Sequence, residues 1–450
     1  MIDTSTFIFQ GWETKNQEIH FRYTLKHGEK EYNFTEKLLL PEAVDFTTIP
    51  QKLLTSLLNN LLLILGISYW KLYCPKTIKI ASFSLSSEQA VFWNTVYTKG
   101  LGEFFYENNI DYRGLVVFPY EQDKNPETPV AFPRKNRSLL PLGGGKDSIV
   151  AGELLKKLGK PFSIATFYTG LTHSIAQEQV VKKMNIDNFL VKRTLDPQLF
   201  VLNKQADAYN GHIPAVAIHS FVSVFLAALY DFRSVIFANE ESASYGNIEY
   251  LGEIVNHQWS KSWEFEKLFA DYIRDNVTPD ILYFSLLRPF SEIHIAKIFS
   301  EHKEYFPLFV SCNRGYAMSQ KGNTSWCGQC PKCAFVFALL SGFVSKPELI
   351  EIFHKDLFDD MSLIPLYREL LGLDGAKPFE CVGTPAEVRL ALYYAYKKKE
   401  WEKSALMQLF IHDILSHMAQ VGEQEIQLFS LKTHQIPKEF SEILQISQGD

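Results

Sequence analysis

Apolar positions follow two different patterns along the chain. Near the N-terminus they partly alternate with polar residues, as over 32–38, and this predicts half-buried β-strands. From residue 138 onward, nearly continuous apolar runs such as 161–168 and 234–238 are separated by stretches with helical spacing. Strands without alternation that are joined by helices are typical of a parallel sheet covered on both faces. The pattern therefore predicts an α/β protein with a central parallel sheet.

The same pattern divides the chain into an N-terminal α+β domain, a linker, a catalytic domain and a C-terminal helical appendage. The linker is expected where Pro, Asn, Lys and Asp accumulate, and the N-terminal domain is expected to include a strand at 114–118. Capping boxes that begin at Ser345 and Thr384 predict helix starts, and the polar tail from about 433 is expected to be loosely held. The predicted bounds are, in order, 1–120, 121–137, 138–340 and 341–450.

A triple-glycine turn lies between the predicted strand at 138–142 and a predicted helix at 148–158. Consecutive glycines let the backbone turn sharply and approach a ligand closely. The helix N-terminus that follows offers N–H groups and a positive dipole end, which suits phosphate. The simpler interpretation is a strand-to-helix turn with Ser148 as N-cap. Because a lysine, an aspartate and a serine follow without a gap, we favour a phosphate site formed by Gly143, Gly144, Gly145, Lys146, Asp147 and Ser148.

Polar residues that follow the other predicted strands are further candidates, because ligands of such sheets gather at the carboxyl ends of the strands. Tyr168 ends the second strand, and Glu240 and Glu241 follow the fourth. His212 precedes a long apolar helix, and His257 lies a little further along. We interpret the two glutamates and the two histidines as candidate acid–base groups. Their alternative interpretation is as helix caps and solvated loop residues.

Four of the six cysteines have the spacing of a metal site, with a C-x-x-C-x-x-C run and one cysteine upstream: Cys312, Cys327, Cys330 and Cys333. They predict a closed four-sulfur site that holds structural Zn²⁺ and fixes the loop, with an iron–sulfur cluster as the main competitor. The alternative is a set of free or disulfide-bonded thiols. We expect the remaining two, Cys74 and Cys381, to be ordinary buried residues.

Composition narrows the class of protein. The chain has 450 residues, of which 46% are apolar, and a net charge of −6, which argues against an extended nucleic-acid surface. The apolar stretches 53–70 and 214–230 read as buried helices rather than membrane spans. The first residues show no signal peptide. Clustered cysteines without an export signal suit a reducing cytoplasm, so we expect a cytoplasmic protein without a membrane or nucleic-acid partner.

The run 143–148 resembles the Ser-Gly-Gly-x-Asp-Ser loop of the PP-loop ATP pyrophosphatases, with Gly143 in place of the first serine and its hydroxyl. Together with the four cysteines it is similar to two families. One is the 7-cyano-7-deazaguanine synthases, which are much shorter. The other is the UDP-N-acetylmuramoyl-L-alanyl-L-glutamate epimerase (MurL) family, which the chain resembles in length and in the spelling of 141–148 and 326–335.

The resemblance implies a sheet of the PP-loop (adenine nucleotide alpha hydrolase-like) type and an enzyme that uses ATP and Mg²⁺. Such an enzyme inverts the terminal L-glutamate of UDP-MurNAc-L-Ala-L-Glu, a nucleotide-sugar dipeptide, and releases AMP and pyrophosphate during peptidoglycan precursor synthesis. Lys146 would offset phosphate charge, and Asp147 would position Mg²⁺ or the loop. Glu240, Glu241, His212 and His257 would be candidates for proton transfer at Cα. Basic residues available for the uridine diphosphate are Arg193, Lys261, Arg288 and Arg314.

Two other functions stay open at this point. A PP-loop ligase that modifies a nucleobase or tRNA shares the loop and the cysteines, although the net negative charge counts against a tRNA substrate. A non-catalytic nucleotide-binding protein with a degenerate loop is suggested only by Gly143. The residues Lys146, Asp147 and Ser148, which match the motif, count against that interpretation.

Overall fold

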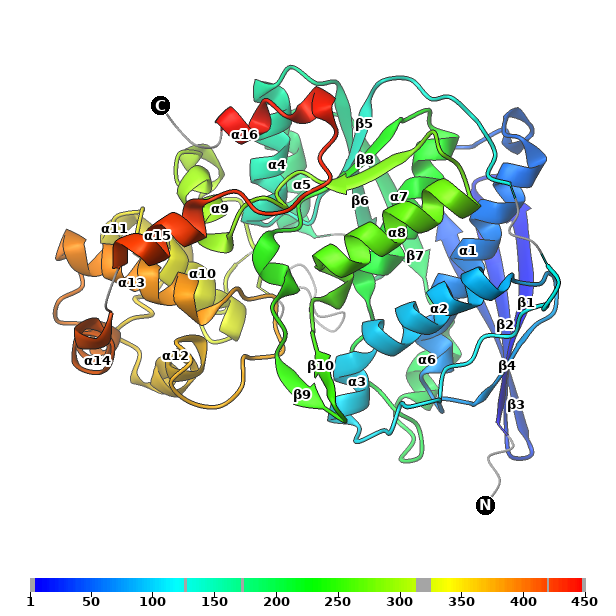
Figure 1. The fold of residues 1–450 in the computed structure, drawn as a ribbon, viewed down its shortest axis with the longest axis horizontal. Helices are drawn as coiled ribbons and strands as arrows, with labels where there is room; N and C mark the ends of the chain where they lie inside the picture. Colours follow the sequence, from blue (N-terminus) through cyan, green and yellow to red (C-terminus); the bar gives the residue numbers. More distant parts are fainter. Residues whose placement is uncertain (1–4, 125–127, 171–173, 313–324, 419–420, 447–450) are drawn as a thin grey trace.

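A single nine-stranded sheet runs through the protein (Figure 1). The strand order is β11-β8-β5-β6-β7-β3-β2-β1-β4, and the part from β11 to β7 is parallel. The strands are β1 (Thr6–Lys15), β2 (Glu18–His27), β3 (Lys30–Leu39), β4 (Thr77–Ile80), β5 (Ser138–Pro141), β6 (Phe162–Tyr168), β7 (Asn188–Thr194), β8 (Ser234–Phe237) and β11 (Leu282–Ser285). This computed structural model describes residues 5–124, 128–170, 174–312, 325–418 and 421–446.

Consecutive residues of the parallel strands enter two separate hydrophobic cores. Leu139 and Val235 belong to one core, whereas Leu140 and Ile236 belong to the other. Side chains of a strand point alternately to its two faces, so both faces of this part of the sheet are covered. The structure confirms the predicted α/β architecture with a mostly parallel central sheet.

Helices separate the parallel strands along the chain and cover the two faces. Leucines at 154 and 155 of α4 join the core on one face, and α7 carries Phe221 and Phe225 into the other. The helices of this part are α4 (Lys146–Lys157), α5 (Ile175–Met184), α6 (Pro197–Leu202), α7 (Ala215–Leu229), α8 (Trp263–Asn276) and α9 (Glu292–Phe299). A short hairpin, β9 (Ile248–Tyr250) with β10 (Glu253–Val255), lies outside the main sheet.

The N-terminal strands continue this sheet. β3 pairs antiparallel with β7, so that Leu38 lies opposite Arg193. On this side the sheet packs against the leucine-rich helix α1 (Gln51–Trp70), followed by α2 (Ser87–Gly100) and α3 (Gly102–Glu107). The predicted bounds 1–120 and 138–340 thus enclose strands of one shared sheet.

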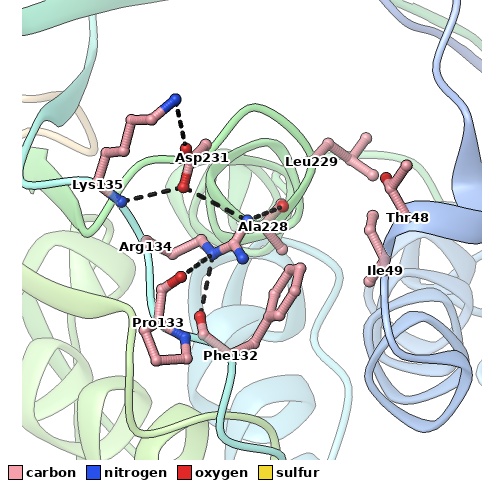
Figure 2. A pocket seen from close by; sticks show the side chains of 9 residues that line it. All are labelled: Thr48, Ile49, Phe132, Pro133, Arg134, Lys135, Ala228, Leu229 and Asp231. Atoms are coloured by element: carbon pink, nitrogen blue, oxygen red, sulfur yellow. Dashed lines mark hydrogen bonds and ion pairs between the residues drawn. The ribbon is translucent and has the colours of Figure 1, made fainter.

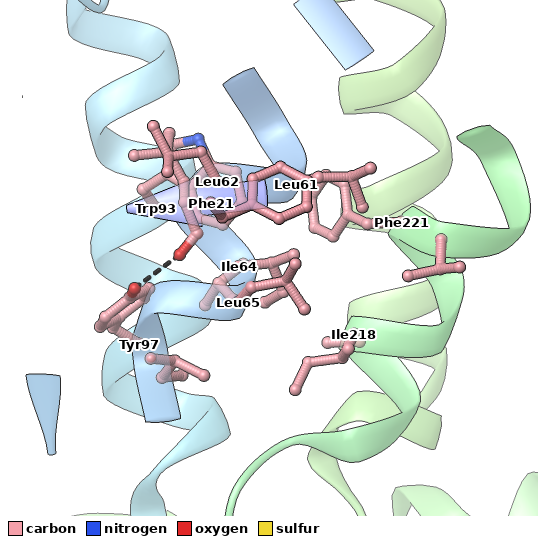
Figure 3. Packing of buried hydrophobic residues seen from close by; sticks show 14 of the residues in the cluster. Phe21, Leu61, Leu62, Ile64, Leu65, Trp93, Tyr97, Ile218 and Phe221 are labelled. Atoms are coloured by element: carbon pink, nitrogen blue, oxygen red, sulfur yellow. Dashed lines mark hydrogen bonds between the residues drawn. The ribbon is translucent and has the colours of Figure 1, made fainter. Parts of the chain in front are cut away.

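Helix α1 is the only described helix that is long and apolar enough to cross a membrane, and 83% of its most apolar window is buried in the protein. Figure 3 shows it between α2 and α7, with Trp93 and Phe221 stacked at 5.1 Å between ring centroids. The Tyr97 hydroxyl donates to the Leu63 carbonyl over 2.6 Å. α1 is therefore a core helix here, as its pattern predicts.

Two local predictions are wrong. The stretch 114–118 forms no strand, because its backbone finds a side-chain partner instead of a strand: the Phe118 amide donates to Asn94 Oδ1 over 2.8 Å. The polar tail is not loosely held over its described part, because Ile436, Phe440 and Ile443 are buried in the core.

The C-terminal helices pack together beside α9 and α4 (Figure 1). Both capping boxes form, at Ser345 with Glu348 and at Thr384 with Glu387. The helices are α10 (Pro331–Ser341), α11 (Lys346–Phe353), α12 (Ile364–Leu370), α13 (Pro385–Lys398), α14 (Ala405–Asp413), α15 (Val421–Phe429) and α16 (Ile443–Ile446).

Residues 132–135 of the predicted linker dock on the end of α7 and line a cavity of about 500 Å³ (Figure 2). The Arg134 guanidinium lies 3.3 Å from the centroid of the Phe132 ring, and Asp231 accepts from the Lys135 amide over 3.0 Å. These residues come just before β5 and β8, at the amino ends of the parallel strands. The cavity therefore lies at the edge of the sheet opposite to the glycine turn.

Candidate active site

The glycine turn connects β5 directly to α4. Gly144 has φ +86°, a backbone conformation that favours glycine. Gly145, and not Ser148, is the N-cap of α4, and the Ser148 hydroxyl donates to the Gly145 carbonyl over 3.1 Å. A Cβ on Gly145 would lie 3.1 Å from Ser311 Cβ, so the turn needs glycine there for close packing. The simpler interpretation with Ser148 as N-cap is wrong in this respect.

A second chain segment lies against the turn. The Val310 amide donates to the Gly144 carbonyl over 3.4 Å. The next side chain, Ser311, has a buried hydroxyl with no hydrogen-bond partner within the part of the chain that the structure describes. This hydroxyl lies 3.7 Å from where a Gly145 Cβ would be. A donor without a partner is thus held beside the glycines.

Three carboxylates gather at the first turn of α4. One oxygen each of Asp147, Glu240 and Glu292 lie within 4.8 Å of one another. Asp147 comes from α4, Glu240 follows β8, and Glu292 begins α9. Glu240 and Glu292 are 2% and 1% exposed, and Glu292 Oε1 accepts no hydrogen bond from any described residue. Buried carboxylate oxygens with unused lone pairs are the ligands that Mg²⁺ prefers, so this cluster can hold a divalent cation.

Lysines surround the carboxylates. Lys146 forms ion pairs with both Asp147 and Glu292, and Lys332 Nζ lies 3.6 Å from Glu292 Oε1. Burial alone would lower the pKa of Lys146, but the two carboxylates beside it raise that pKa instead. Lys146 therefore stays charged, and the cluster combines a candidate cation site with fixed positive charge for phosphate.

The pKa values of the carboxylates diverge. Burial and the negative charge of Glu292 raise the pKa of Glu240 to about 7, against the positive charge of Lys261. Burial would also raise the pKa of Asp147, but Lys146 and Lys332 outweigh burial and lower it. Asp147 is therefore ionised at neutral pH, whereas Glu240 takes up a proton readily when no cation is bound.

Glu292 is held in place from the C-terminal helices. Its backbone amide donates to Glu387 Oε1 over 2.6 Å, and the Ser242 hydroxyl donates to the same oxygen over 2.5 Å. The other oxygen of Glu387 closes the capping box of α13, where it accepts from the Thr384 amide over 2.6 Å. The capping box was expected to be a folding signal, and it also positions a site carboxylate.

A second polar cluster contains His257, His212 and two residues that the sequence did not indicate. His257 Nδ1 pairs with Glu103 of α3, and His257 Nε2 lies 3.8 Å from Cys381 Sγ. His212 Nδ1 is 3.3 Å from the same Glu103 carboxylate. The two histidines meet as expected of residues near the carboxyl ends of the strands, but they do not join the Asp147 cluster.

The pKa values of two groups in this second cluster differ strongly from their ordinary values. Burial would raise the pKa of the Cys381 thiol, but Lys261, His257 and Lys332 lower it to about 5. Burial would lower the pKa of His257, but Cys381 and Glu103 raise it to about 9. Cys381 is thus not the ordinary buried residue that we expected, because it lies among cations rather than in an apolar core.

The four predicted cysteine ligands come together around the start of α10. Their sulfurs lie within 4.8 Å of one another, with 3.9 Å between Cys312 and Cys330 and 3.6 Å between Cys327 and Cys333. Four thiolates around tetrahedral Zn²⁺ at about 2.3 Å would be about 3.8 Å apart. The sulfur positions therefore fit a tetrahedral metal, and the segment that carries Cys312 also carries Ser311.

Other candidates are placed less directly. Glu241 is half-buried and lies outside the carboxylate cluster. Tyr168 ends β6, which is the strand next to β5 in the sheet. Arg193 and Arg288 are not available to a substrate, because they form buried ion pairs with Glu36 and Glu266. Lys261 interacts electrostatically with Glu240, Asp147 and Glu292 of the carboxylate cluster. Arg314 lies outside the described residues.

Several site residues escaped the sequence interpretation: Glu103, Glu292, Ser311, Lys332, Cys381 and Glu387. Glu292 follows Ser291 at a helix start and looks like an ordinary first-turn acid. Lys332 had a signal, because it lies inside the cysteine run. Cys381 had a weaker one, as a cysteine that follows a glutamate in a polar loop.

Comparison with known proteins decides which family this site belongs to. A model of the MurL N-terminal domain matches residues 2–286, and a model of the MurL C-terminal domain matches residues 308–425. The chain belongs to the MurL family. This family member is 39% identical to the UDP-N-acetyl-alpha-D-muramoyl-L-alanyl-L-glutamate epimerase of Xanthomonas oryzae pv. oryzae over 84% of its own length and 83% of the relative's.

Relatives from other bacteria carry the same name. A Micromonospora epimerase is 35% identical to this MurL family member, over 91% of this chain and 90% of the relative. The epimerase of Salinispora tropica is 34% identical, over 91% of this chain and 88% of the relative. The two regions matched by the family models contain the glycine turn and the cysteine cluster of this chain.

Proposed function

We propose that this protein is an epimerase that inverts the terminal L-glutamate of UDP-MurNAc-L-Ala-L-Glu to D-glutamate. The observation that carries the proposal is similarity over 84% to 91% of the chain to three epimerases of that name, at 34% to 39% identity. The substrate is a nucleotide-sugar dipeptide, so the reaction belongs to peptidoglycan precursor synthesis. Four clustered cysteines suit a reducing compartment, which supports a cytoplasmic location for the enzyme.

ATP activates the glutamate in this proposal. The turn 143–146 with the N-terminus of α4 would hold the phosphates, and Lys146 would offset their charge. The unpartnered Ser311 hydroxyl replaces the hydroxyl that Gly143 lacks relative to the PP-loop motif. The strand order β8-β5-β6-β7, with the turn after the central β5, supports this placement of a nucleotide at the carboxyl edge.

Asp147, Glu240 and Glu292 would hold Mg²⁺. When bound, Mg²⁺ neutralises phosphate charge and orients the phosphate groups. The protein itself keeps Lys146 charged and fixes Glu292 through Glu387, so the carboxylates and cations are already in place when the nucleotide binds.

Adenylation makes inversion at Cα possible. Transfer of AMP to the carboxylate releases pyrophosphate and removes the negative charge beside Cα. The Cα–H bond then becomes acidic enough for a side-chain base, because the carbanion is delocalised into the acyl group. Removal of the proton from one face and its return to the other gives the D centre. Hydrolysis of the acyl adenylate releases AMP.

The four cysteines would hold structural Zn²⁺, as their sulfur spacing supports. A closed four-thiolate site leaves no open position for substrate. Its role is to fix the segment that holds Ser311 against the glycine turn.

The proposal is tested with ATP, Mg²⁺ and UDP-MurNAc-L-Ala-L-Glu in D₂O. Pyrophosphate release that depends on the dipeptide substrate, together with deuterium at glutamate Cα, is the expected result. Absence of exchange at that carbon would refute the epimerase. Absence of pyrophosphate with exchange intact would refute adenylation only. An Asp147→Ala variant should lose pyrophosphate release, and the matched substitution Asp187→Ala, outside the site, should not.

A further inference from the structure

Cys381 lies where three distant segments of the chain converge. It belongs to the loop before α13, while His257 follows β10, Glu103 lies in the first turn of α3, and Lys261 ends a short helical turn before α8. The Sγ atom is 3.8 Å from His257 Nε2, and His257 Nδ1 pairs with Glu103. A thiol, an imidazole and a carboxylate in one line are the arrangement that activates a cysteine.

The surroundings of this thiol are charged rather than apolar. Lys332 donates to the Cys381 carbonyl, and Lys261 is close enough to lower the pKa of the thiol. A purely structural cysteine in an apolar core would show the opposite shift, because burial favours the neutral thiol. Cys381 is also half-buried rather than sealed, so part of its surface faces solvent.

The thiol cluster adjoins the carboxylate cluster. The ammonium of Lys332 contacts the Cys381 carbonyl and lies 3.6 Å from Glu292 Oε1. The negative charges of Cys381, Glu240 and Asp147 outweigh the burial of Lys261 and raise its pKa. This ammonium therefore interacts with both the thiol cluster and the carboxylate cluster. The two clusters are therefore connected through the ammonium groups of Lys332 and Lys261, and a glutamate adenylated beside Asp147 would lie next to both.

We propose that Cys381 Sγ transfers the Cα proton on one face of the substrate glutamate, with His257 and Glu103 as positioning residues. The assignment rests on the proposed epimerase reaction. The thiolate takes the Cα proton and becomes a neutral thiol, and the electron pair of the broken C–H bond moves into the adenylated acyl group. A second acid then delivers a proton to the opposite face, with Glu241 as the remaining predicted candidate, because Glu240 is assigned to the cation. Lys261 offers a positive charge to the oxygen on which negative charge develops.

The first test separates proton transfer from adenylation. Cys381→Ala is compared with Cys74→Ala, a buried cysteine outside the site, in pyrophosphate–ATP exchange and in deuterium exchange at Cα. We expect Cys381→Ala to lose Cα exchange by at least about 100-fold, the usual contribution of a general base. Its substrate-dependent pyrophosphate exchange should stay within about threefold of the wild type, and this also shows that the variant is folded.

Three outcomes would overturn the assignment. One is Cα exchange that falls no further than pyrophosphate exchange. Another is Cα exchange close to that of Cys74→Ala. A third is a substrate-sized adduct on Cys381 in the intact mass of enzyme quenched during turnover, which would make it a nucleophile. If wild-type enzyme shows Cα exchange but no pyrophosphate exchange, adenylation fails while the Cys381 assignment is still tested by the exchange at Cα.

The second test addresses the role of His257. Iodoacetamide alkylation of Cys381, followed by peptide mass, reports its thiolate fraction. In the wild type the rate should vary little between about pH 6 and pH 8, whereas in His257→Gln it should be lower at pH 6 and rise steeply with pH. A merely structural histidine would leave this profile unchanged, and that result would overturn its positioning role.

Discussion

Removal of one buried carboxylate should weaken the junction between the N-terminal strands and the parallel strands that carry the site. Glu36 of β3 is fully buried and accepts from Arg193 of β7 at two positions, over 2.5 Å and 3.1 Å. Among the described residues, the guanidinium makes one further side-chain hydrogen bond, to the Ser68 hydroxyl over 2.8 Å. The ion pair therefore crosses the antiparallel junction between β3 and the parallel strands that begin at β7.

Glu36→Gln keeps the size of the side chain and removes its charge. The Arg193 guanidinium then stays buried with a single hydroxyl and a neutral amide as partners. Loss of one partner of a buried ion pair costs about 3–5 kcal/mol, because the remaining charge is uncompensated. Glu31→Gln is the matched control on the same strand, since Glu31 pairs with Lys26 at 3.0 Å with both side chains 50% exposed.

Urea unfolding followed by circular dichroism at 25 °C measures the effect. We expect a clear fall in the midpoint for Glu36→Gln, with an unchanged slope, and no change for Glu31→Gln. The double variant Glu36→Leu with Arg193→Met should recover most of the stability, because it leaves no buried charge. A midpoint for Glu36→Gln equal to that of Glu31→Gln would refute the argument that this pair ties the sheet together.

Three further predictions concern the site. Ser311→Ala should raise the KM for ATP about 10- to 100-fold, which corresponds to the loss of one hydrogen bond to a charged group. Steady-state kinetics measures this, with Ser300→Ala as the control. Equal KM values for the two variants would contradict the role of Ser311. Glu292→Gln should weaken Mg²⁺ binding at least about tenfold in a titration of activity against Mg²⁺, and an unchanged midpoint would remove Glu292 from the cation site. Cys330→Ser should purify without zinc and with reduced solubility, as measured by elemental analysis. Unchanged metal content would contradict the four-sulfur site, and iron in the wild type would favour a cluster instead.

Features with a local cause could be predicted from the sequence. The runs at β5 and β6 are apolar because both faces of the sheet are covered, so the parallel part was visible without any tertiary information. The glycine turn and the cysteine cluster were visible for a similar reason, since backbone conformation and metal-ligand spacing constrain neighbouring residues. The stretch 114–118 has the composition of a strand, but it packs on α2 and pairs with no strand of the described sheet.

The rest of the site depends on convergence. Glu103, His257 and Cys381 are more than a hundred residues apart from one another, and none lies in a recognisable motif. Their meeting is fixed by how α3, the segment after β10 and the loop before α13 pack. A carboxylate or thiol in a loop is usually solvated, so single residues of this kind carried no signal until the fold placed them together.

The double use of Glu387 limits how members of this family can be recombined. Its carboxylate starts α13 in the region matched by the C-terminal domain model, and it fixes the amide of Glu292, which lies between the two matched regions. A chimera that joins residues 1–307 of this chain to the C-terminal domain of a relative takes the two sides of this contact from different parents. Both parents then have to place their side of the hydrogen bond in matching geometry, so the two domains constrain each other at the site.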